Sequence, residues 1–357
     1  MGRIKNHVTI QDIARELHLS RNTVSKALKN SKDVSNETKQ LVVTKAFEMG
    51  YSKLSPALLK QFNVEKKSNQ NKSIVVLARR ESSIFWGNII MGISEEINKY
   101  ESKLQVNFIS EYDEKNLILP VNFQDKIEGI IFLNVFSKKY IDEIMKYNTD
   151  TAVVFLDAPN DVYSIADYGD IVILEGVNSV KTITKHLIEQ GMRKIGFIGD
   201  ITYCKTIYDR YQGFLNAMNS AGLELDESII AVYHPSKRFY DASEIEAALK
   251  KFPYLPEALV CANDDIALNV VKYLKKQGIS VPDDVAVTGY DNLESMMHVV
   301  EPFLTTVGFS KHMLGRRLVQ QLMWRMRNPE FPKEVVYIGV DIIFRRSSQR
   351  VLLKARN

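Results

Sequence analysis

The amino-acid sequence predicts a small all-α helix-turn-helix domain followed by a two-lobed α/β domain with mostly parallel sheets. Three helical patterns, each preceded by a capping residue, lie within the first 50 residues. From residue 74 onwards, short apolar runs alternate with helical patterns in two successive series. Repeated βαβ units build parallel sheets, and two series imply two lobes. We therefore expect a first domain at 1–54, a hinge or linker at 55–72 and a larger domain at 73–348.

The first two helices are predicted by capping residues eleven positions apart, a spacing typical of a helix-turn-helix. Thr9 and Ser20 are these caps. One face of each helix is apolar, with Ile10, Ile13, Ala14 and Leu17 on the first and Val24, Ala27 and Leu28 on the second. The polar face of the second helix suits base edges and phosphates. The side chains that we expect to contact DNA here are Thr9, Ser20, Arg21, Asn22, Thr23, Ser25 and Lys26.

A third helix is expected to begin after Ser35 and to end at Gly50. Its apolar stripe is formed by Leu41, Val42, Ala46, Phe47 and Met49. Three helices with one exposed polar face make a small DNA-binding domain. We also expect Ser35 to contact DNA. A small helical cap on an enzyme is the alternative at this point.

The distribution of charge favours the DNA reader. The first 73 residues carry 14 Lys and Arg against 6 Asp and Glu, a net charge of +8, whereas the whole chain is only +4. The remainder is therefore −4. A basic run alone is more often a solvated face, but with the helical pattern it indicates contact with phosphates.

These motifs closely resemble the N-terminal domain of the LacI/GalR family of bacterial transcription regulators. The resemblance is carried by the order V-T-I-x-D-I-A at residues 8–14, L-S-x-x-T-V-S at 19–25, V-S-x-x-T at 34–38 and G-Y at 50–51. It implies a homodimer that binds a pseudo-palindromic operator. It also implies a hinge helix that places a leucine in the minor groove, where such a wedge kinks DNA at a cost of a few kcal/mol.

The hinge departs from the family pattern. Lys53 stands where the family usually has proline, and Ala57-Leu58-Leu59-Lys60 replaces its Ala-Arg-x-Leu. A short helix is expected from Ser55 and Pro56 onwards. Leu58 or Leu59 is the candidate wedge, and an ordinary linker helix is the alternative.

The α/β part consists of two series of strands and helices. Strands of the first series are expected at 73–78, 106–109, 129–133 and 153–156, with a helix at 89–100. The second series is expected to hold a helix to 190, strands at 194–199, 258–261 and 284–289, and helices at 210–222 and 265–277. We expect the first lobe at about 73–170 and 306–330, and the second at about 171–305 and 331–348.

The family resemblance extends through this part. The motifs are L-I-E-Q-G-M-R-K-I-G-F-I-G at 187–199, C-A-N-D-D-I-A-L at 261–268, V-P-D-D-V-A-V-T-G-Y-D-N at 281–292 and L-T-T-V at 304–307. They resemble the family's effector domain and imply a periplasmic-binding-protein-like fold. In that fold the segment 305–309 crosses back to the first lobe and a small effector binds between the lobes.

Polar residues just past strand ends are the candidate effector ligands, because ligands bind beyond the carboxyl ends of parallel strands. Carboxylates and a guanidinium that converge on a cleft suit paired hydroxyls, and aromatic rings can stack on a sugar face. The candidates are Phe85, Trp86, Asp157, Arg210, Asn263, Asp264 and Asp291. Alternatively, Trp86 belongs to the core, and Asp264 and Asp265 cap the helix that follows.

A sugar or sugar phosphate is the effector that the resemblance implies. The aromatic segment Tyr233–Tyr240, with His234 and Arg238, matches no particular ligand. The sequence leaves open whether the effector induces or corepresses, and it does not identify the operator.

Other classes of protein are disfavoured. A hydrophobic content of 45% and a charged content of 25% are ordinary for a globular protein, and the sequence has neither a bilayer-length apolar run nor a signal-peptide pattern. Cys204 and Cys261 have no metal-ligand spacing. Enzyme motifs such as a P-loop or a nucleophile elbow are missing, and a solute receptor of a transporter would need export. We expect a cytoplasmic, dimeric repressor of carbohydrate-metabolism genes, without metal or cofactor.

Overall fold

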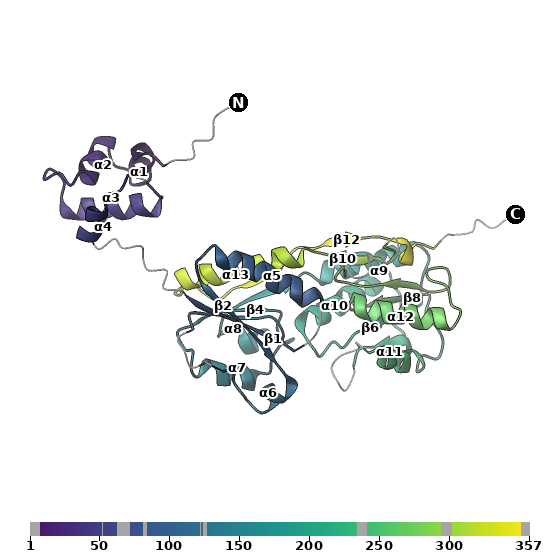
Figure 1. Cartoon of the computed structure of the whole chain (residues 1–357). Coiled ribbons are helices and arrows are strands. Elements are labelled where there is room, and N and C mark those ends of the chain that lie inside the picture. The colour runs from purple at the N-terminus through teal and green to yellow at the C-terminus, as the bar shows by residue number, and fades with distance from the viewer. Residues whose placement is uncertain are drawn as a thin grey trace. The chain divides into compact units, whose positions relative to one another are not determined.

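The computed structural model of the chain divides into two compact units, Met1–Asn71 and Lys72–Asn357 (Figure 1). We call them the N-terminal unit and the C-terminal unit. The structure describes residues 8–51, 53–62, 72–80, 84–121, 123, 127–233, 241–293 and 302–350. The polar end of the predicted linker and the segment 234–240 lie outside the described residues.

The N-terminal unit is built from four helices around a small apolar core. They are α1 (Ile10–Glu16), α2 (Arg21–Leu28), α3 (Asn36–Glu48) and α4 (Pro56–Gln61). The three expected caps are confirmed: the side chains of Thr9, Ser20 and Ser35 each accept a backbone N–H of the helix that follows. Thr9 also forms a capping box with Asp12. The core consists mainly of Ile13, Ala14, Val24, Ala27, Val42 and Ala46.

One expectation for this unit is wrong. Leu41 is 53% exposed, and Val43 is fully buried in its place. The reason is that α3 is covered on two sides: Val42 faces α1 and α2, whereas Val43 packs on α4. Leu58 of α4 packs with Val43 and is buried, while Leu59 is half-buried.

The first lobe of the C-terminal unit contains a six-stranded sheet in which every strand pair is parallel. Its spatial order is β11-β5-β4-β3-β1-β2. The strands are β1 (Ser73–Arg79), β2 (Lys103–Ile109), β3 (Gly129–Phe132), β4 (Ala152–Leu156), β5 (Asp170–Leu174) and β11 (Val335–Ile338). One face packs on α5 (Ile84–Asn98) and α13 (Lys311–Arg327), and the other on α7 (Lys138–Met145) and α8 (Tyr163–Ala166). A short α6 (Glu111–Lys115) follows β2.

The division between the lobes differs from the expected one. Strand β5 pairs with β4, and β11 pairs with β5. Both therefore belong to the sheet of the first lobe, although we expected 171–305 and 331–348 in the second. A strand such as β5, in which every residue after Asp170 is apolar, is buried on both faces in either sheet, so its pattern does not reveal its partners.

Helices α5 and α13 lie side by side over this sheet (Figure 1). Glycines allow their close approach. A Cβ added at Gly92 would lie 2.0 Å from the carbonyl oxygen of His312, and one added at Gly315 would lie 2.1 Å from that of Ile89. Nearby, the Arg325 guanidinium is 1% exposed and forms a two-pronged ion pair with Asp170, which fixes the end of α13 to β5.

The second lobe contains a four-stranded parallel sheet of order β7-β6-β8-β9. Its strands are β6 (Ile195–Ile198), β7 (Ile230–Ala231), β8 (Ala258–Cys261) and β9 (Ala286–Thr288). Its helices form two packed pairs: α9 (Val177–Glu189) with α10 (Lys205–Ser220), and α11 (Ala242–Leu249) with α12 (Asp264–Lys276). Both cysteines are buried in this lobe.

Two antiparallel strands, β10 (Thr306–Gly308) and β12 (Asp341–Ile343), connect the lobes (Figure 1). Thr305 forms a bridge to Thr288 of the second lobe, and the chain then enters α13 of the first. Phe309 and Val340 contact the cores of both lobes. The crossing that we expected at 305–309 is therefore present. Within the described ranges, no helix has the length and apolar character needed to cross a membrane.

Candidate functional site

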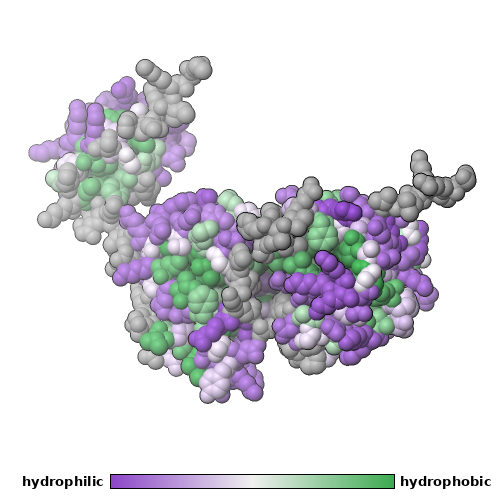
Figure 2. Space-filling model, turned by 45° about the vertical axis from the view of Figure 1, so that its right-hand side comes forward, coloured by the Kyte–Doolittle hydropathy of each residue, from purple (hydrophilic) through white to green (hydrophobic). Residues whose placement is uncertain are grey.

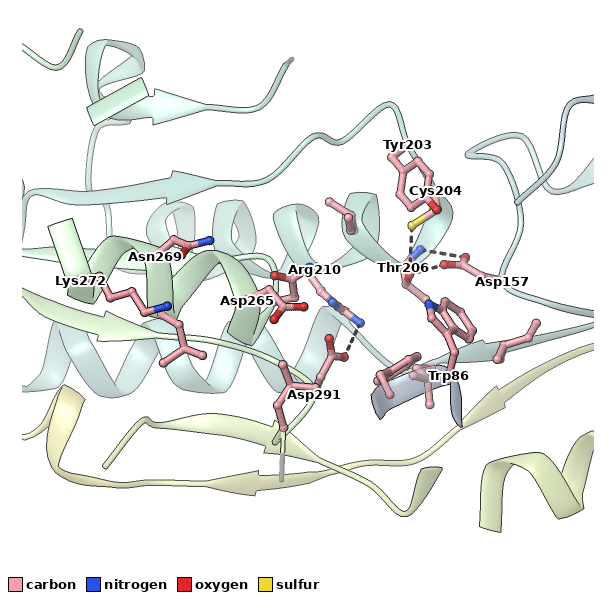
Figure 3. Close-up of a pocket in the computed structure, with 17 residues that line it drawn as sticks. Trp86, Asp157, Tyr203, Cys204, Thr206, Arg210, Asp265, Asn269, Lys272 and Asp291 are labelled. Atoms are coloured by element: carbon pink, nitrogen blue, oxygen red, sulfur yellow. Dashed lines mark hydrogen bonds and ion pairs between the residues drawn. The ribbon is translucent and has the colours of Figure 1, made fainter. Parts of the chain in front are cut away.

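A cavity of about 500 Å³ lies in the C-terminal unit, beyond the carboxyl ends of strands from both lobes (Figure 3). The visible face of the unit is indented between the lobes (Figure 2). The structure brings six of the seven candidate effector ligands together here, and the seventh, Asp264, does not line the cavity. The lining consists of Phe85, Trp86, Leu156, Asp157, Leu174, Tyr203, Cys204, Thr206, Ile207, Arg210, Asn263, Asp265, Leu268, Asn269, Lys272, Asp291 and Leu293.

Arg210 occupies the middle of the cavity lining, although its side chain is only 5% exposed. Its Nη1 donates to the carbonyl oxygen of Ala262 at 2.6 Å, and its Nη2 lies 3.5 Å from the Asp291 carboxylate. The guanidinium carbon lies 3.5 Å from the centre of the Tyr290 ring, a cation–π contact. The Nε atom is buried without a partner. These contacts fix the guanidinium rigidly toward the cavity.

Asp291 is held in a strained backbone conformation with φ +109°. Burial raises the pKa of its carboxyl to about 6, and the positive charge of Arg210 opposes this shift. Lys311, at the start of α13, donates to the carbonyl oxygen of Asp291 and, at 2.8 Å, to that of Asn292. The first lobe thus holds the backbone of a residue that lines the cavity.

Asp157 also has a positive φ of 70° and connects the two lobes. Its carboxylate accepts the backbone N–H of Ala158 at 2.8 Å and that of Thr206 at 3.2 Å, and it also accepts the Thr206 hydroxyl. The N–H of Lys205 donates to the carbonyl oxygen of Ala158 at 2.8 Å. Asp157 of the first lobe therefore caps α10 of the second. Because this helix begins at Lys205, Arg210 lies in its second turn rather than opening it as expected.

Asn263, Asp264 and Asp265 have roles that differ from those we expected. Asn263 caps α12, because its side chain accepts the N–H of Ile266 at 2.9 Å. Asp264 is buried and accepts the Thr306 hydroxyl at 2.7 Å and the N–H of Leu293 at 2.9 Å. Asp265 is exposed to the cavity. Neither aspartate is the cap that the sequence suggested.

The aromatic wall consists of Phe85 and Trp86 at the start of α5. Their rings meet edge to face with centres 4.8 Å apart, and Phe85 contacts Phe309 of the connecting segment at 6.1 Å. Both residues are half-buried and also pack against the core of the first lobe. Trp86 thus combines the core role and the cavity role that we set out as alternatives.

The sequence reasoning missed two groups of lining residues. One consists of Tyr203, Cys204, Thr206 and Ile207 at the start of α10, and the other of Leu268, Asn269 and Lys272 on α12. The second group could have been found from its spacing, because residues three, four and seven positions after Asp265 share one face of a helix. Among the described residues, no cluster of His, Cys, Asp or Glu could hold a metal ion.

The polar face of α2 forms the candidate DNA-contacting surface of the N-terminal unit. Arg21 and Asn22 are exposed, and Thr23, Ser25 and Lys26 are partly exposed. The Lys26 ammonium forms an ion pair with Asp33 at 2.9 Å. The oxygens of Thr9, Ser20 and Ser35 are already used in capping. Arg21 and Asn22 are therefore the side chains best placed to reach bases.

Two family models match the chain. Residues 9–53 match the model for bacterial regulatory proteins of the lacI family, and residues 184–348 match that for a periplasmic binding protein-like domain. The HTH-type transcriptional repressor PurR of Mannheimia succiniciproducens is 26% identical over 345 residues, covering 96% of this chain and 99% of the relative.

Solved structures show the same fold. A complex of the transcriptional regulator CelR with cellobiose has a TM-score of 0.66 at 21% identity, covering 96% of this chain and all of that one. A Lac repressor dimer bound to operator and the anti-inducer ONPF has a TM-score of 0.62 at 18% identity, covering 96% of this chain and 99% of that one.

The fold and the matched models define a helix-turn-helix transcription regulator with a periplasmic-binding-protein-like domain. The chain therefore carries a DNA-binding domain of the lacI family of bacterial regulatory proteins, followed by a periplasmic binding protein-like domain. It is accordingly a DNA-binding regulator and not an enzyme, as the sequence predicted.

Proposed function

We propose that this protein is a dimeric repressor whose affinity for a pseudo-palindromic operator is set by a small polar effector in the cavity. The observation that carries the proposal is the convergence of six side chains from separate segments of both lobes on one cavity. A ligand that touches both lobes can favour one arrangement of the lobes over another. Such a regulator acts in the bacterial cytoplasm.

The contacts around the cavity suggest how the effector changes DNA binding. Asp157 and Thr206 join the lobes at one wall, and Lys311 joins Asp291 to α13 at another. An effector that alters the Lys311 junction shifts α13 and its partner α5, on the first lobe. If the first lobes pair across the dimer axis, the shift of α13 and α5 changes the distance between the two N-terminal units. That distance decides whether both units can bind the two half-sites of one operator. A coupling of 1–3 kcal/mol is typical.

The effector that we favour is a sugar. Buried carboxylates beside a fixed guanidinium suit paired hydroxyls, and Trp86 offers an aromatic face. A purine base is the second candidate, because the relatives named PurR suggest repression of purine metabolism. Sugar phosphates, which the family resemblance also implied, are included in the test below.

The test of the effector is a thermal-shift screen of sugars, sugar phosphates and purine bases. A ligand at about 100 times its dissociation constant adds about 2.7 kcal/mol to the free energy of unfolding. Arg210→Met should abolish that gain while the control variant Arg193→Met, at an exposed position outside the cavity, keeps it. An equal gain in both variants would place the ligand elsewhere.

The repressor and dimer proposals have separate measurements. Sedimentation velocity should give the mass of two chains, and a monomer would contradict the dimer. A ligand found in the screen should change the operator dissociation constant by about 5- to 150-fold. At the hinge we propose Leu59 as the minor-groove wedge, since Leu58 is buried against Val43. Leu59→Ala should then weaken operator binding more than non-specific binding.

A further inference from the structure

We propose that the cavity takes a neutral effector of two linked sugar rings, the second of which lies against α12. This rests on the proposed function and names the ligand class of the same site. The wall concerned consists of Asp265, Leu268, Asn269 and Lys272, which we call the α12 wall. None of these residues was among the candidate ligands from the sequence.

The α12 wall forms one end of the cavity lining. Asp265, Leu268, Asn269 and Lys272 share one face of α12 because of their spacing. Figure 3 shows Asn269 and Lys272 at one end of the lining, Trp86, Asp157 and Tyr203 at the other, and Arg210 with Asp291 between them. A single ring stacked on Trp86 and bonded to Arg210 would leave the α12 end to solvent. The volume of about 500 Å³ falls in the range of pockets that bind drug-sized ligands.

Two side chains of the α12 wall have hydrogen-bonding capacity to spare. At the other end, both oxygens of the Asp157 carboxylate accept hydrogen bonds, and Arg210 uses Nη1 and Nη2 within the protein. By contrast, Asp265 and Lys272 are exposed, and neither forms a hydrogen bond or an ion pair with any other described residue. These two groups are therefore free to bind a ligand without breaking a contact.

The chemistry of the wall favours hydroxyl groups. A carboxylate only accepts hydrogen bonds, an ammonium only donates them and an amide does both. Vicinal hydroxyls, which donate and accept, can bind the carboxylate and the ammonium together, and Leu268 supplies an apolar surface for the ring carbons.

The charge balance argues against an anionic second group. The cavity lining carries three aspartates against one arginine and one lysine. Asp291 forms an ion pair with Arg210. On the α12 wall, the negative charge of Asp265 compensates the positive charge of Lys272. A phosphate placed there would meet that carboxylate. A neutral ring would not incur this repulsion, which is why we favour it over a phosphorylated sugar.

Isothermal titration calorimetry on the full chain tests the proposal. The probes are cellobiose, maltose, lactose and sucrose, their component monosaccharides, sugar phosphates and purine bases. We expect one disaccharide to bind at least about tenfold tighter than its monosaccharides. Lys272→Ala and Asp265→Ala should each weaken that disaccharide by about tenfold, the loss of one hydrogen bond to a charged group, and leave monosaccharide binding unchanged.

Lys275→Ala is the matched control, because it removes an exposed lysine of α12 outside the cavity lining. Equal affinity for mono- and disaccharides, with no effect of Lys272→Ala, would overturn the two-ring effector and leave a sugar-controlled repressor standing. Tighter binding of a sugar phosphate that Lys272→Ala abolishes would overturn the neutral second ring. Binding of purine bases alone, or of no probe, would overturn both this inference and the proposed sugar effector.

Discussion

The buried carboxyl of Asp264 should make the stability of the C-terminal unit depend on pH. Its side chain is 1% exposed and holds the connecting segment through the Thr306 hydroxyl and the N–H of Leu293. Burial, assisted by the negative charge of Asp291, raises the pKa of Asp264 to about 7 from its ordinary value of 3.8. The folded protein therefore keeps a proton that the unfolded chain loses at lower pH.

The sign and size of the effect follow from this difference. Because the folded state binds more protons between the two pKa values, the free energy of unfolding falls as the pH rises from about 4 to about 7. The full loss is about 4 kcal/mol, of which about 3 kcal/mol falls between about pH 5 and about pH 8. Asp264→Asn keeps an acceptor for the Leu293 N–H and carries no charge. Its stability relative to the parent protein should thus rise by about 3 kcal/mol over that interval.

Urea unfolding followed by tryptophan fluorescence measures this quantity. Both tryptophans, Trp86 and Trp324, lie in the C-terminal unit, so the signal reports on that unit alone. Asp150→Asn removes a charge at an exposed position of the first lobe and serves as the control. An Asp264→Asn stability difference that is the same at both pH values would refute the reasoning, since the carboxyl would then be ionised in the folded protein.

Three further predictions concern packing, capping and charge. Gly315→Ala should lower the free energy of unfolding by about 1–3 kcal/mol, because the added Cβ would lie 2.1 Å from the carbonyl oxygen of Ile89. An unchanged midpoint of urea unfolding would contradict the tight contact between α5 and α13. Ser20→Ala should cost the N-terminal unit about 1 kcal/mol, seen by circular dichroism, through loss of the α2 cap. Asp33→Asn should release Lys26 from its ion pair, so that Lys26 can contact a DNA phosphate. The plot of log binding constant against log salt concentration should then become steeper by about one phosphate contact. An unchanged slope would mean that Lys26 does not reach phosphate.

The N-terminal unit was predictable because its signals are local. A capping oxygen lies within three residues of the N–H that it accepts, so Thr9, Ser20 and Ser35 could be recognised from sequence alone. The candidate cavity ligands were predictable for a different reason: carboxyl ends of parallel strands meet at one edge, whatever the details of packing.

The errors arose where the deciding contact is distant in sequence. The start of α10 was placed too late because its cap, Asp157, comes from the other lobe. Residues 171–174 were assigned to the wrong lobe because a strand that is buried on both faces does not specify its neighbours. Leu41 was expected to be buried, but the contact between α3 and α4 buries Val43 instead.

The central claim is that the exposed face of α2 reads nucleobases, and selection from randomised duplexes tests it most directly. At near-physiological salt, the protein should enrich a pseudo-palindromic sequence. Arg21→Ala should lose discrimination at one position of each half-site, at a cost of about 1–3 kcal/mol. No enrichment by the parent protein, with or without a bound effector, or the same preferred sequence and affinity for Arg21→Ala, would contradict the account.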